Sequence, residues 1–402
     1  MNETPRHSGT ANGGAAIICG GRLMLVRPDG TRREIHSAFV QAMIDREEQR
    51  KTRHGWKDKS VGWSATAIPS EVEALRMTAA PRDGQRVTDF VDVTPIDADR
   101  MLYALRTEAF GGLFEYTISA DEERRLAHKA EFAISEIDAH QVDGRLIASL
   151  AYADGTSNLA TMRADGGRLS TITEGDSIDQ APRWARDRDD VIVYQSAGIA
   201  RDHDGFLADV SPFRIEALEL ASQRHEVLAE SHQHDLIMPF RLSDGALMYV
   251  RRPHEPQQRS PDAMTVVKDF VLFPARLASA VFWFLNSFSM VFNRKPLTSA
   301  GGPDQRGPTA RQLVLYGRII EMQKRGRRSD PQGAVVPGDW QLVRREPGGD
   351  ERVLARGVGH YDVGDDGAVV YSNGQRVWRI DPQGKRTELA REQLVERVAA
   401  LH

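Results

Sequence analysis

A unit of strand, tight turn and strand recurs along this chain at intervals near 40 residues, and this repeat limits the possible folds more than any other feature of the sequence. The clearest copy covers residues 155–196. Its turn is centred on Asp165, Gly166 and Gly167, where positive φ is easily adopted and a hairpin can close. The copy ends in the apolar, β-branched run 191–194, which predicts an inner, buried strand.

Further copies follow the same order of strands and turns. Residues 235–250 contain Asp244-Gly245, and residues 362–390 contain Asn373-Gly374, a strong hairpin signal. Weaker copies cover residues 97–126 and 137–150. The N-terminal segment 20–35 repeats the later half of the last copy, so the head of the chain resembles its tail. The predicted turns fall near residues 30, 84, 121, 166, 223, 348 and 384.

This pattern predicts an all-β fold, a β-propeller of six or seven four-stranded blades, because closing such repeats into a ring removes their exposed sheet edges. We expect the blades in residues 13–252 and 338–390, with the two ends of the chain side by side in the ring. Residues 1–12 are expected to be disordered, and residues 391–402 to form a helical tail. Three of the intervals between turns exceed 40 residues, so they hold insertions.

Residues 155–196 resemble the repeat of TolB-type propellers. Asp179, Pro182 and Trp184, placed before a buried strand, carry the likeness. The chain departs from that family's pattern at 185–190, where Ala-Arg-Asp-Arg-Asp-Asp stands in place of Ser-Pro-Asp-Gly. The resemblance implies a fold and no activity. TolB itself is secreted, but residues 1–18 lack the basic and apolar regions of a signal peptide, so we expect this chain to be cytoplasmic.

Two of the insertions are short. Residues 36–60 predict a short amphipathic helix that caps the propeller. The apolar residues at helical spacing in it are Phe39, Val40, Met43 and Ile44. Residues 198–213 contain Asp-His-Asp-Gly at 202–205, which is similar to the start of a calcium loop but lacks the further ligands and the bidentate Glu. We expect a solvated polar loop there.

The third insertion, residues 253–337, is predicted to be largely helical and hydrophobic. Its segment 270–292 has 17 apolar residues of 23, and a helix from near Pro274 to Phe292 would be about 28 Å long. A single membrane crossing would tear the ring if the flanks 235–252 and 340–355 belong to one blade. The apolar surface is therefore covered by the propeller's own face, by a partner protein or by the headgroup region of a membrane.

The segment is flanked by the basic residues Lys268, Arg294 and Lys295, which suit anionic headgroups and keep the last of these coverings open beside the other two. Buried aromatic side chains dominate the binding energy of most interfaces. The candidate partner-binding or membrane-binding residues are Phe270, Phe273, Leu277, Val281, Trp283, Phe284 and Phe288.

Sequence signs of catalysis are few. The serine contexts Gly62-Trp-Ser-Ala-Thr and Gly175-Asp-Ser-Ile-Asp are not nucleophile elbows, and a phosphate-binding loop of the Gly-x4-Gly-Lys type is absent from the sequence. The best cluster is residues 230–235, in which His232 and His234 at i, i+2 lie on one side of an extended strand and could hold zinc. Asp235 occupies the place of Asp179 in the repeat, which favours a structural turn instead. We expect no cofactor and no metal.

Charge and cysteine content exclude other classes. The 53 basic and 57 acidic side chains give a net charge of −4, so a global field that favours nucleic acid is missing. The single cysteine, Cys19, excludes an internal disulfide. Eight Lys against 45 Arg indicate a GC-rich, bacterial genome.

These observations together predict a non-enzymatic cytoplasmic scaffold that binds a partner protein or the membrane face through the insertion. The alternative is a propeller enzyme, a metal-dependent hydrolase or lyase with its site in the central channel.

Overall fold

The computed structural model describes residues 13–54, 89–107, 110–129, 134–152, 154–203, 207–255, 312–315, 318–321 and 335–401. Strands dominate these residues, as the all-β prediction requires. Four separate four-stranded sheets are present in them. Their orders are β27(Val395–Ala400)-β1(Ala15–Cys19)-β2(Arg22–Val26)-β3(Arg32–Ile35); β4(Asp89–Pro95)-β5(Arg100–Arg106)-β6(Gly111–Thr117)-β7(Glu122–Lys129); β17(His234–Arg241)-β18(Leu247–Pro253)-β21(Gln341–Arg345)-β22(Glu351–Arg356); and β23(His360–Val363)-β24(Val369–Ser372)-β25(Arg376–Ile380)-β26(Arg386–Arg391).

A nine-stranded sheet consists of two further groups that meet through one parallel residue pair, Ser157 with Ile178. The first group is β8(Ile134–Ala139), β9(Leu146–Ala151), β10(Ser157–Met162) and the short β11(Ser170–Thr171). The second is β12(Ser177–Trp184), β13(Val191–Arg201), β15(Arg214–Glu219) and β16(Arg224–Ala229), with β14(Leu207–Val210) added to β13. Within each group the neighbouring strands are antiparallel.

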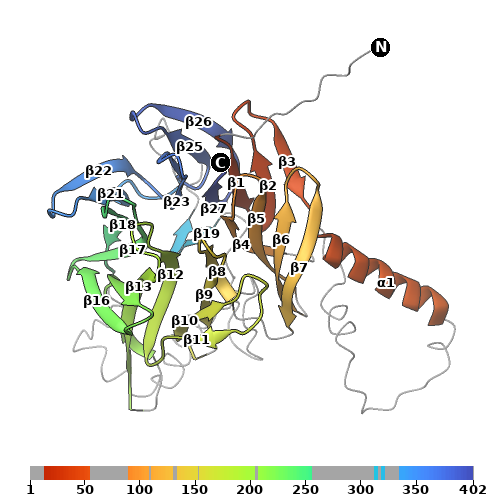
Figure 1. Cartoon of the computed structure of the whole chain (residues 1–402), viewed down its shortest axis with the longest axis horizontal. Coiled ribbons are helices and arrows are strands. Elements are labelled where there is room, and N and C mark those ends of the chain that lie inside the picture. Colours follow the sequence, from red (N-terminus) through yellow and green to blue (C-terminus); the bar gives the residue numbers. More distant parts are fainter. Residues whose placement is uncertain are drawn as a thin grey trace, which may run out of the picture.

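The first strands of the groups surround one axis (Figure 1). Within the described residues, β27, β4, β8, β12, β17 and β23 contact one another in that order, and β23 contacts β27 again, so the cycle is closed. The later strands of each group lie progressively farther from the axis. This is the arrangement of a β-propeller.

The two ends of the chain lie side by side, as predicted. β1 pairs antiparallel with β27, from Ala15 opposite Ala400 to Cys19 opposite Val395. The prediction of a helical tail over 391–402 is wrong, because residues 395–400 form β27. Good helix formers lie there in the sequence, but pairing with β1 buries Val395, Val398 and Ala400, and this tertiary burial outweighs local propensity.

The predicted helix in the first insertion is confirmed as α1 (Ala38–His54). Ser37 caps its start, since the Val40 amide donates to Ser37 Oγ at 3.3 Å. The Phe39 amide donates to Glu123 Oε1 on β7 at 3.0 Å, and the Phe39 ring packs edge-on against Phe110 with centroids 5.7 Å apart. These contacts fix the first turns of α1 on the outside of the β4–β7 sheet.

The second insertion continues the sheet instead of forming a polar loop. β13 extends to Arg201, and Ile199 pairs with Val210 of β14. The extension forms because Ile199 and Val210 pack against the neighbouring apolar cluster. Residues 204–206, which include part of the predicted Asp-His-Asp-Gly run, lie outside the described residues.

The third insertion begins and ends within one sheet, as its flanks predicted. β18 and β21 pair directly, from Leu247 opposite Arg345 to Arg251 opposite Gln341. Inside the insertion the structure describes the hairpin of β19(Gln312–Leu315) and β20(Arg318–Glu321), which are strands. The segment 270–292 and its seven candidate binding residues lie outside the described residues, as do residues 1–12. Among the helices that are described, none is both long and apolar enough to span a membrane.

All three insertions leave the ring at the same end. Because neighbouring strands of a blade are antiparallel, the connections between its first and second strands and between its third and fourth strands lie at one end. The remaining connections, β3 to β4, β13 to β15 and β18 to β21, lie at the other end and contain the insertions. We call these the turn end and the insertion end. Predicted tight turns at the turn end are confirmed, since Gly166 has φ 77° and Gly245 has φ 80°.

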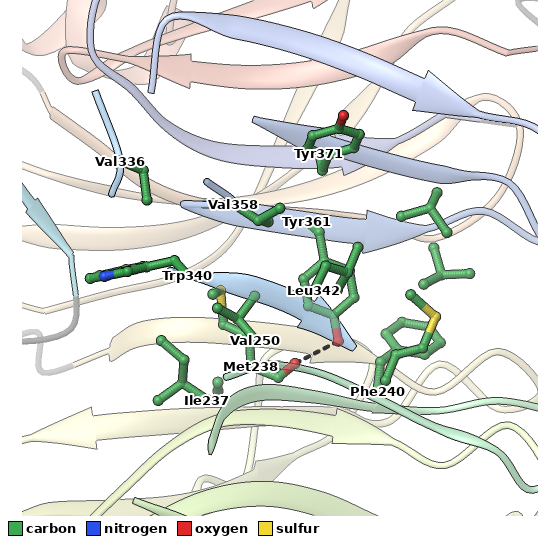
Figure 2. Packing of buried hydrophobic residues seen from close by; sticks show 14 of the residues in the cluster. Ile237, Met238, Phe240, Val250, Val336, Trp340, Leu342, Val358, Tyr361 and Tyr371 are labelled. Atoms are coloured by element: carbon green, nitrogen blue, oxygen red, sulfur yellow. Dashed lines mark hydrogen bonds between the residues drawn. The ribbon is translucent and has the colours of Figure 1, made fainter. Parts of the chain in front are cut away.

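Apolar side chains fill the space between neighbouring sheets. Figure 2 shows the cluster between the β17–β22 and β23–β26 sheets, with Trp340, Leu342 and Val358 buried in it. The Tyr361 side chain reaches across this cluster, and its hydroxyl donates to the Met238 carbonyl at 2.7 Å. The blades are therefore held to one another by packing and by polar contacts near the axis.

Candidate functional site

The inner strands bring seven ionisable side chains together in the central channel. These side chains, which we call the channel cluster, are Asp92 on β4, Glu136 and Asp138 on β8, Arg183 on β12, His360 and Asp362 on β23, and Arg397 on β27. The side chain of each is at most 16% exposed. Charged groups this deeply buried require partners.

Two arginines supply those partners across blade boundaries. Arg183 Nη1 lies 3.2 Å from Asp138 Oδ1, and its Nη2 lies 3.8 Å from Asp362 Oδ1. Arg397 Nε lies 3.6 Å from Asp92 Oδ1, and its Nη2 lies 3.4 Å from Glu136 Oε1.

Each guanidinium thus joins three inner strands: Arg183 connects β12 with β8 and β23, and Arg397 connects β27 with β4 and β8. The two arginines tie together blades that are far apart in the sequence.

The carboxylates also accept backbone amides of the next inner strand. Asp92 Oδ2 accepts the Ile137 amide at 2.8 Å, and Glu136 Oε2 accepts the Ala181 amide at 2.7 Å. The same relation holds for Asp138 with the Trp184 amide and for Asp362 with the Ala400 amide, both at 2.8 Å. Each carboxylate therefore has a cationic partner and a backbone donor. This pattern is typical of carboxylates that stabilise the contact between neighbouring blades.

Two residues of the channel wall have left-handed backbone conformations. Ala181 has φ 49° and Met238 has φ 55°, and a proline follows each of them. The Ala181 amide is accepted by Glu136 and the Met238 amide by Gln195 Oε1 at 2.8 Å. Such a conformation costs about 1–3 kcal/mol for a residue with a Cβ, so the surrounding hydrogen bonds must hold it in place.

These two bulges correct one equivalence drawn from the sequence. The register shifts between Gln180 and Arg183 in β12 and between Ile237 and Phe240 in β17. Aligning the shifts places Ile178, not Asp179, at the position of Asp235. The alignment of the two repeats by sequence was wrong at this position, because Asp235 lies one residue farther from its bulge than Asp179 does.

Burial sets the protonation of the channel cluster. It raises the pKa of Asp92 to about 6 against the opposing effect of Arg397 and Arg183, and it raises the pKa of Asp138 as well. Burial, with Arg397 and Arg183 nearby, lowers the pKa of the His360 imidazole well below its ordinary range. Burial disfavours the charged form of Arg183, but the carboxylates around it outweigh that effect and raise its pKa.

A small cavity lies within the cluster. Its volume for a water-sized occupant is about 20 Å³, and its polar lining comes from Asp92, Glu136, Arg183, His360 and Arg397. This volume is close to the minimum that holds one water molecule.

Contacts across the axis brace the turn end of the channel. Arg186 Nη2 donates to the Val363 carbonyl at 2.8 Å, and Gln141 Nε2 donates to Asp365 Oδ1 at 2.7 Å. At the turn end of the channel, side chains that follow β8 and β12 are therefore joined to the end of β23.

The histidine cluster predicted from the sequence is not assembled around a metal. Asp235 is buried, and its carboxylate accepts Arg252 Nε at 3.0 Å and lies 2.6 Å from His254 Nδ1. His234 Nδ1 lies 3.4 Å from Ser231 Oγ. Among the described residues, no three His, Cys, Asp or Glu side chains are arranged to hold a metal ion. The predicted turn role of Asp235 is wrong, because the residue lies in β17, where it forms a buried ion pair with Arg252 beside the start of the third insertion.

Sequence reasoning missed the channel cluster. A signal for it exists, because polar residues at i, i+2 interrupt otherwise apolar first strands. Asp92 with Thr94, Glu136 with Asp138 and His360 with Asp362 follow this spacing, which places both side chains on one face of a strand. A period of two on the innermost strand of a propeller indicates the channel face.

Comparisons with known proteins concern the fold and leave the activity unassigned. No protein-family model and no curated protein sequence matches the chain. The crystal structure of TolB from Acinetobacter baumannii is similar with a TM-score of 0.50 and 10% identity, over 98% of this chain and 67% of that one. A nidogen/laminin complex gives 0.47 and 7%, over 97% and 99%. A TolB-related structure from Agrobacterium tumefaciens gives 0.40 and 12%, over 77% and 84%. The chain has a β-propeller fold that resembles TolB.

Proposed function

We propose that this chain is a six-bladed, non-enzymatic scaffold of the bacterial cytoplasm that binds a partner protein or the membrane face through residues 253–337. Six blades follow from the six first strands that contact one another in a closed cycle among the described residues. The proposed anchors are the aromatic and aliphatic residues of segment 270–292, foremost Trp283, Phe284 and Phe288.

One observation carries the proposal. Within the part of the chain that the structure describes, the sheet that contains the insertion has its four strands, and β18 pairs with β21 along five residue pairs, without any strand from the insertion. A segment with 17 apolar residues of 23 is therefore an addition to a blade that is already complete. An apolar segment of this size has to be covered, and a scaffold that binds through it supplies the cover.

Charge supports the same proposal. Residues 256–334 hold twelve Lys and Arg against five Asp and Glu, whereas acidic side chains outnumber basic ones in the rest of the chain. A basic, apolar segment suits an acidic protein surface or anionic headgroups. Both ends of the segment return to the insertion end of the ring, so a binding surface there would be shared with the other two insertions.

The channel cluster favours a structural role for the channel over a catalytic one. Its four carboxylates are engaged by two arginines and by backbone amides, and its cavity has room for one water-sized occupant. A catalytic site needs a pocket that admits a substrate and groups free to react. The alternative of a metal-dependent enzyme gains support only if purified protein carries stoichiometric zinc or calcium by elemental analysis.

Replacement of residues 256–334 by a Gly-Ser linker tests the proposal. This variant keeps β18, His254 and the described residues 335–401, so it should stay folded and monomeric with an unchanged melting temperature. We expect it to lose recovery with the partner in pull-down and flotation with anionic vesicles.

A matched pair of point variants separates the anchors from the bulk of the insertion. The triple variant Trp283→Ser, Phe284→Ser and Phe288→Ser should abolish binding. The control variant Ser279→Ala, Asn286→Ala and Ser287→Ala should preserve it. Unchanged binding by both the linker variant and the triple serine variant would exclude the insertion as the binding element.

A further inference from the structure

His360 has a hydrogen-bond donor, its Nε2–H, that no group of the described residues accepts. The Val398 amide donates to its Nδ1 at 3.2 Å, so Nδ1 bears no proton. A neutral imidazole with an accepting Nδ1 carries its proton on Nε2. The residue is 5% exposed, and its Nε2 has no hydrogen-bond partner among the residues that the structure describes.

The unused donor belongs to a side chain that lines the channel cavity. Asp92 and Glu136 line the same cavity from β4 and β8. Each of their carboxylates already accepts one backbone amide and faces Arg397, and a carboxylate has about four acceptor positions. The cavity thus has a donor on the β23 wall and spare acceptor positions on the β4 and β8 walls. Its volume of about 20 Å³ suits one water molecule.

Charge decides the kind of occupant. Two carboxylates and two guanidinium groups line the cavity, so its lining has no excess charge that favours an ion, and an anion would meet both carboxylates. A cation would meet the Nε2 proton and both arginines. Only a neutral molecule that accepts one hydrogen bond, from His360, and donates others, to Asp92 and Glu136, suits all of these groups.

We propose that the channel holds one ordered water molecule, which accepts from His360 Nε2 and donates to the carboxylates of Asp92 and Glu136. The water joins β23 to β4 and β8 beside β27, the strand that closes the ring. Arg183 and Arg397 connect blades around the cavity, and the water adds a further connection between blades inside it. This inference concerns the closure of the ring and is independent of what the insertion binds.

Crystals of the full chain grown in sodium bromide test the site. The expected result is one density peak within hydrogen-bond distance of His360 Nε2, without anomalous signal at the bromine edge. Absence of a peak there, or an anomalous bromide peak, would overturn the proposal.

Two variants and one solution measurement keep the test independent of folding. His360→Gln retains an amide donor near the position of Nε2 and should retain the water, whereas His360→Leu removes the donor at similar volume and should lose it. A water at full occupancy in the leucine variant would show that His360 does not bind it. In the wild-type chain, nitrogen NMR should find the Nε2-protonated tautomer with a cross-peak to a long-lived water, and an Nδ1-protonated ring would contradict the site.

Discussion

Replacing Arg183 by methionine tests the channel cluster most severely. The substitution keeps an unbranched apolar stem but removes the cation that lies 3.2 Å from Asp138 and 3.8 Å from Asp362. The two carboxylates, 14% and 4% exposed, would stay buried without this partner. Breaking a buried ion pair in this way costs about 3–5 kcal/mol. We therefore expect a loss of that size in the free energy of unfolding at pH 8, measured by urea titration with tryptophan fluorescence.

The pH dependence of this loss has a definite sign. Burial raises the pKa of Asp138 and Arg183 opposes the rise, so removing Arg183 raises that pKa further. The folded variant then takes up a proton more readily than its unfolded chain as the pH falls, and its deficit relative to wild type shrinks from pH 8 to pH 5.

The exposed pair of Arg163 and Asp165, 2.5 Å apart, provides the control. Arg163→Met should leave the urea midpoint unchanged. A deficit for Arg183→Met below about 1 kcal/mol, or one that grows on acidification, would refute the reasoning.

Three other predictions concern the channel and the turns. Burial raises the pKa of Asp92 from its ordinary 3.8 to about 6. The protonated carboxyl therefore adds about 3 kcal/mol to the free energy of unfolding at low pH, and this contribution is lost as the pH rises through 6. Asp92→Asn should flatten the dependence of the unfolding free energy on pH between pH 4 and pH 7. Gly30→Ala, at φ 83° with open space around it, should cost about 1 kcal/mol of unfolding free energy. Gly166→Ala should cost clearly more, because its Cβ would lie 2.8 Å from Leu126 Cβ. Equal shifts of the melting temperature in the two variants would contradict this difference. A chain that ends at residue 391 lacks β27 and should lose the hydrogen-exchange protection of the β1 amides, and retained protection would argue against closure of the ring by β27.

Local signals in the sequence were sufficient for the turns, the helix and the class of fold. Gly166 and Gly245 adopt the positive φ of their turns without steric cost, and Phe39 and Val40 are at the spacing that a helix buries on one side. The likeness of head to tail also led to the correct closure, because β1 and β27 are parts of one repeat.

Features that depend on distant segments were missed. The strand β27 was expected to be a helix, since its partner β1 lies at the other end of the chain. The channel cluster combines residues from five strands, and neither Asp92 nor Arg397 shows in the sequence which group it will face. The equivalence of Asp179 and Asp235 failed because Asp235 lies one residue farther from the bulge of its strand than Asp179 does. Repeat letters identify a blade, but the backbone inside the blade decides which side chain reaches the axis.

Photo-crosslinking in living cells tests most directly whether the insertion end is the binding surface. A photoreactive residue at position 283 of the insertion is compared with one at position 383, in an exposed turn at the opposite end of the ring. We predict a protein or lipid adduct from position 283 and none from position 383. An adduct from position 383 alone, or from neither position, would contradict the proposed function.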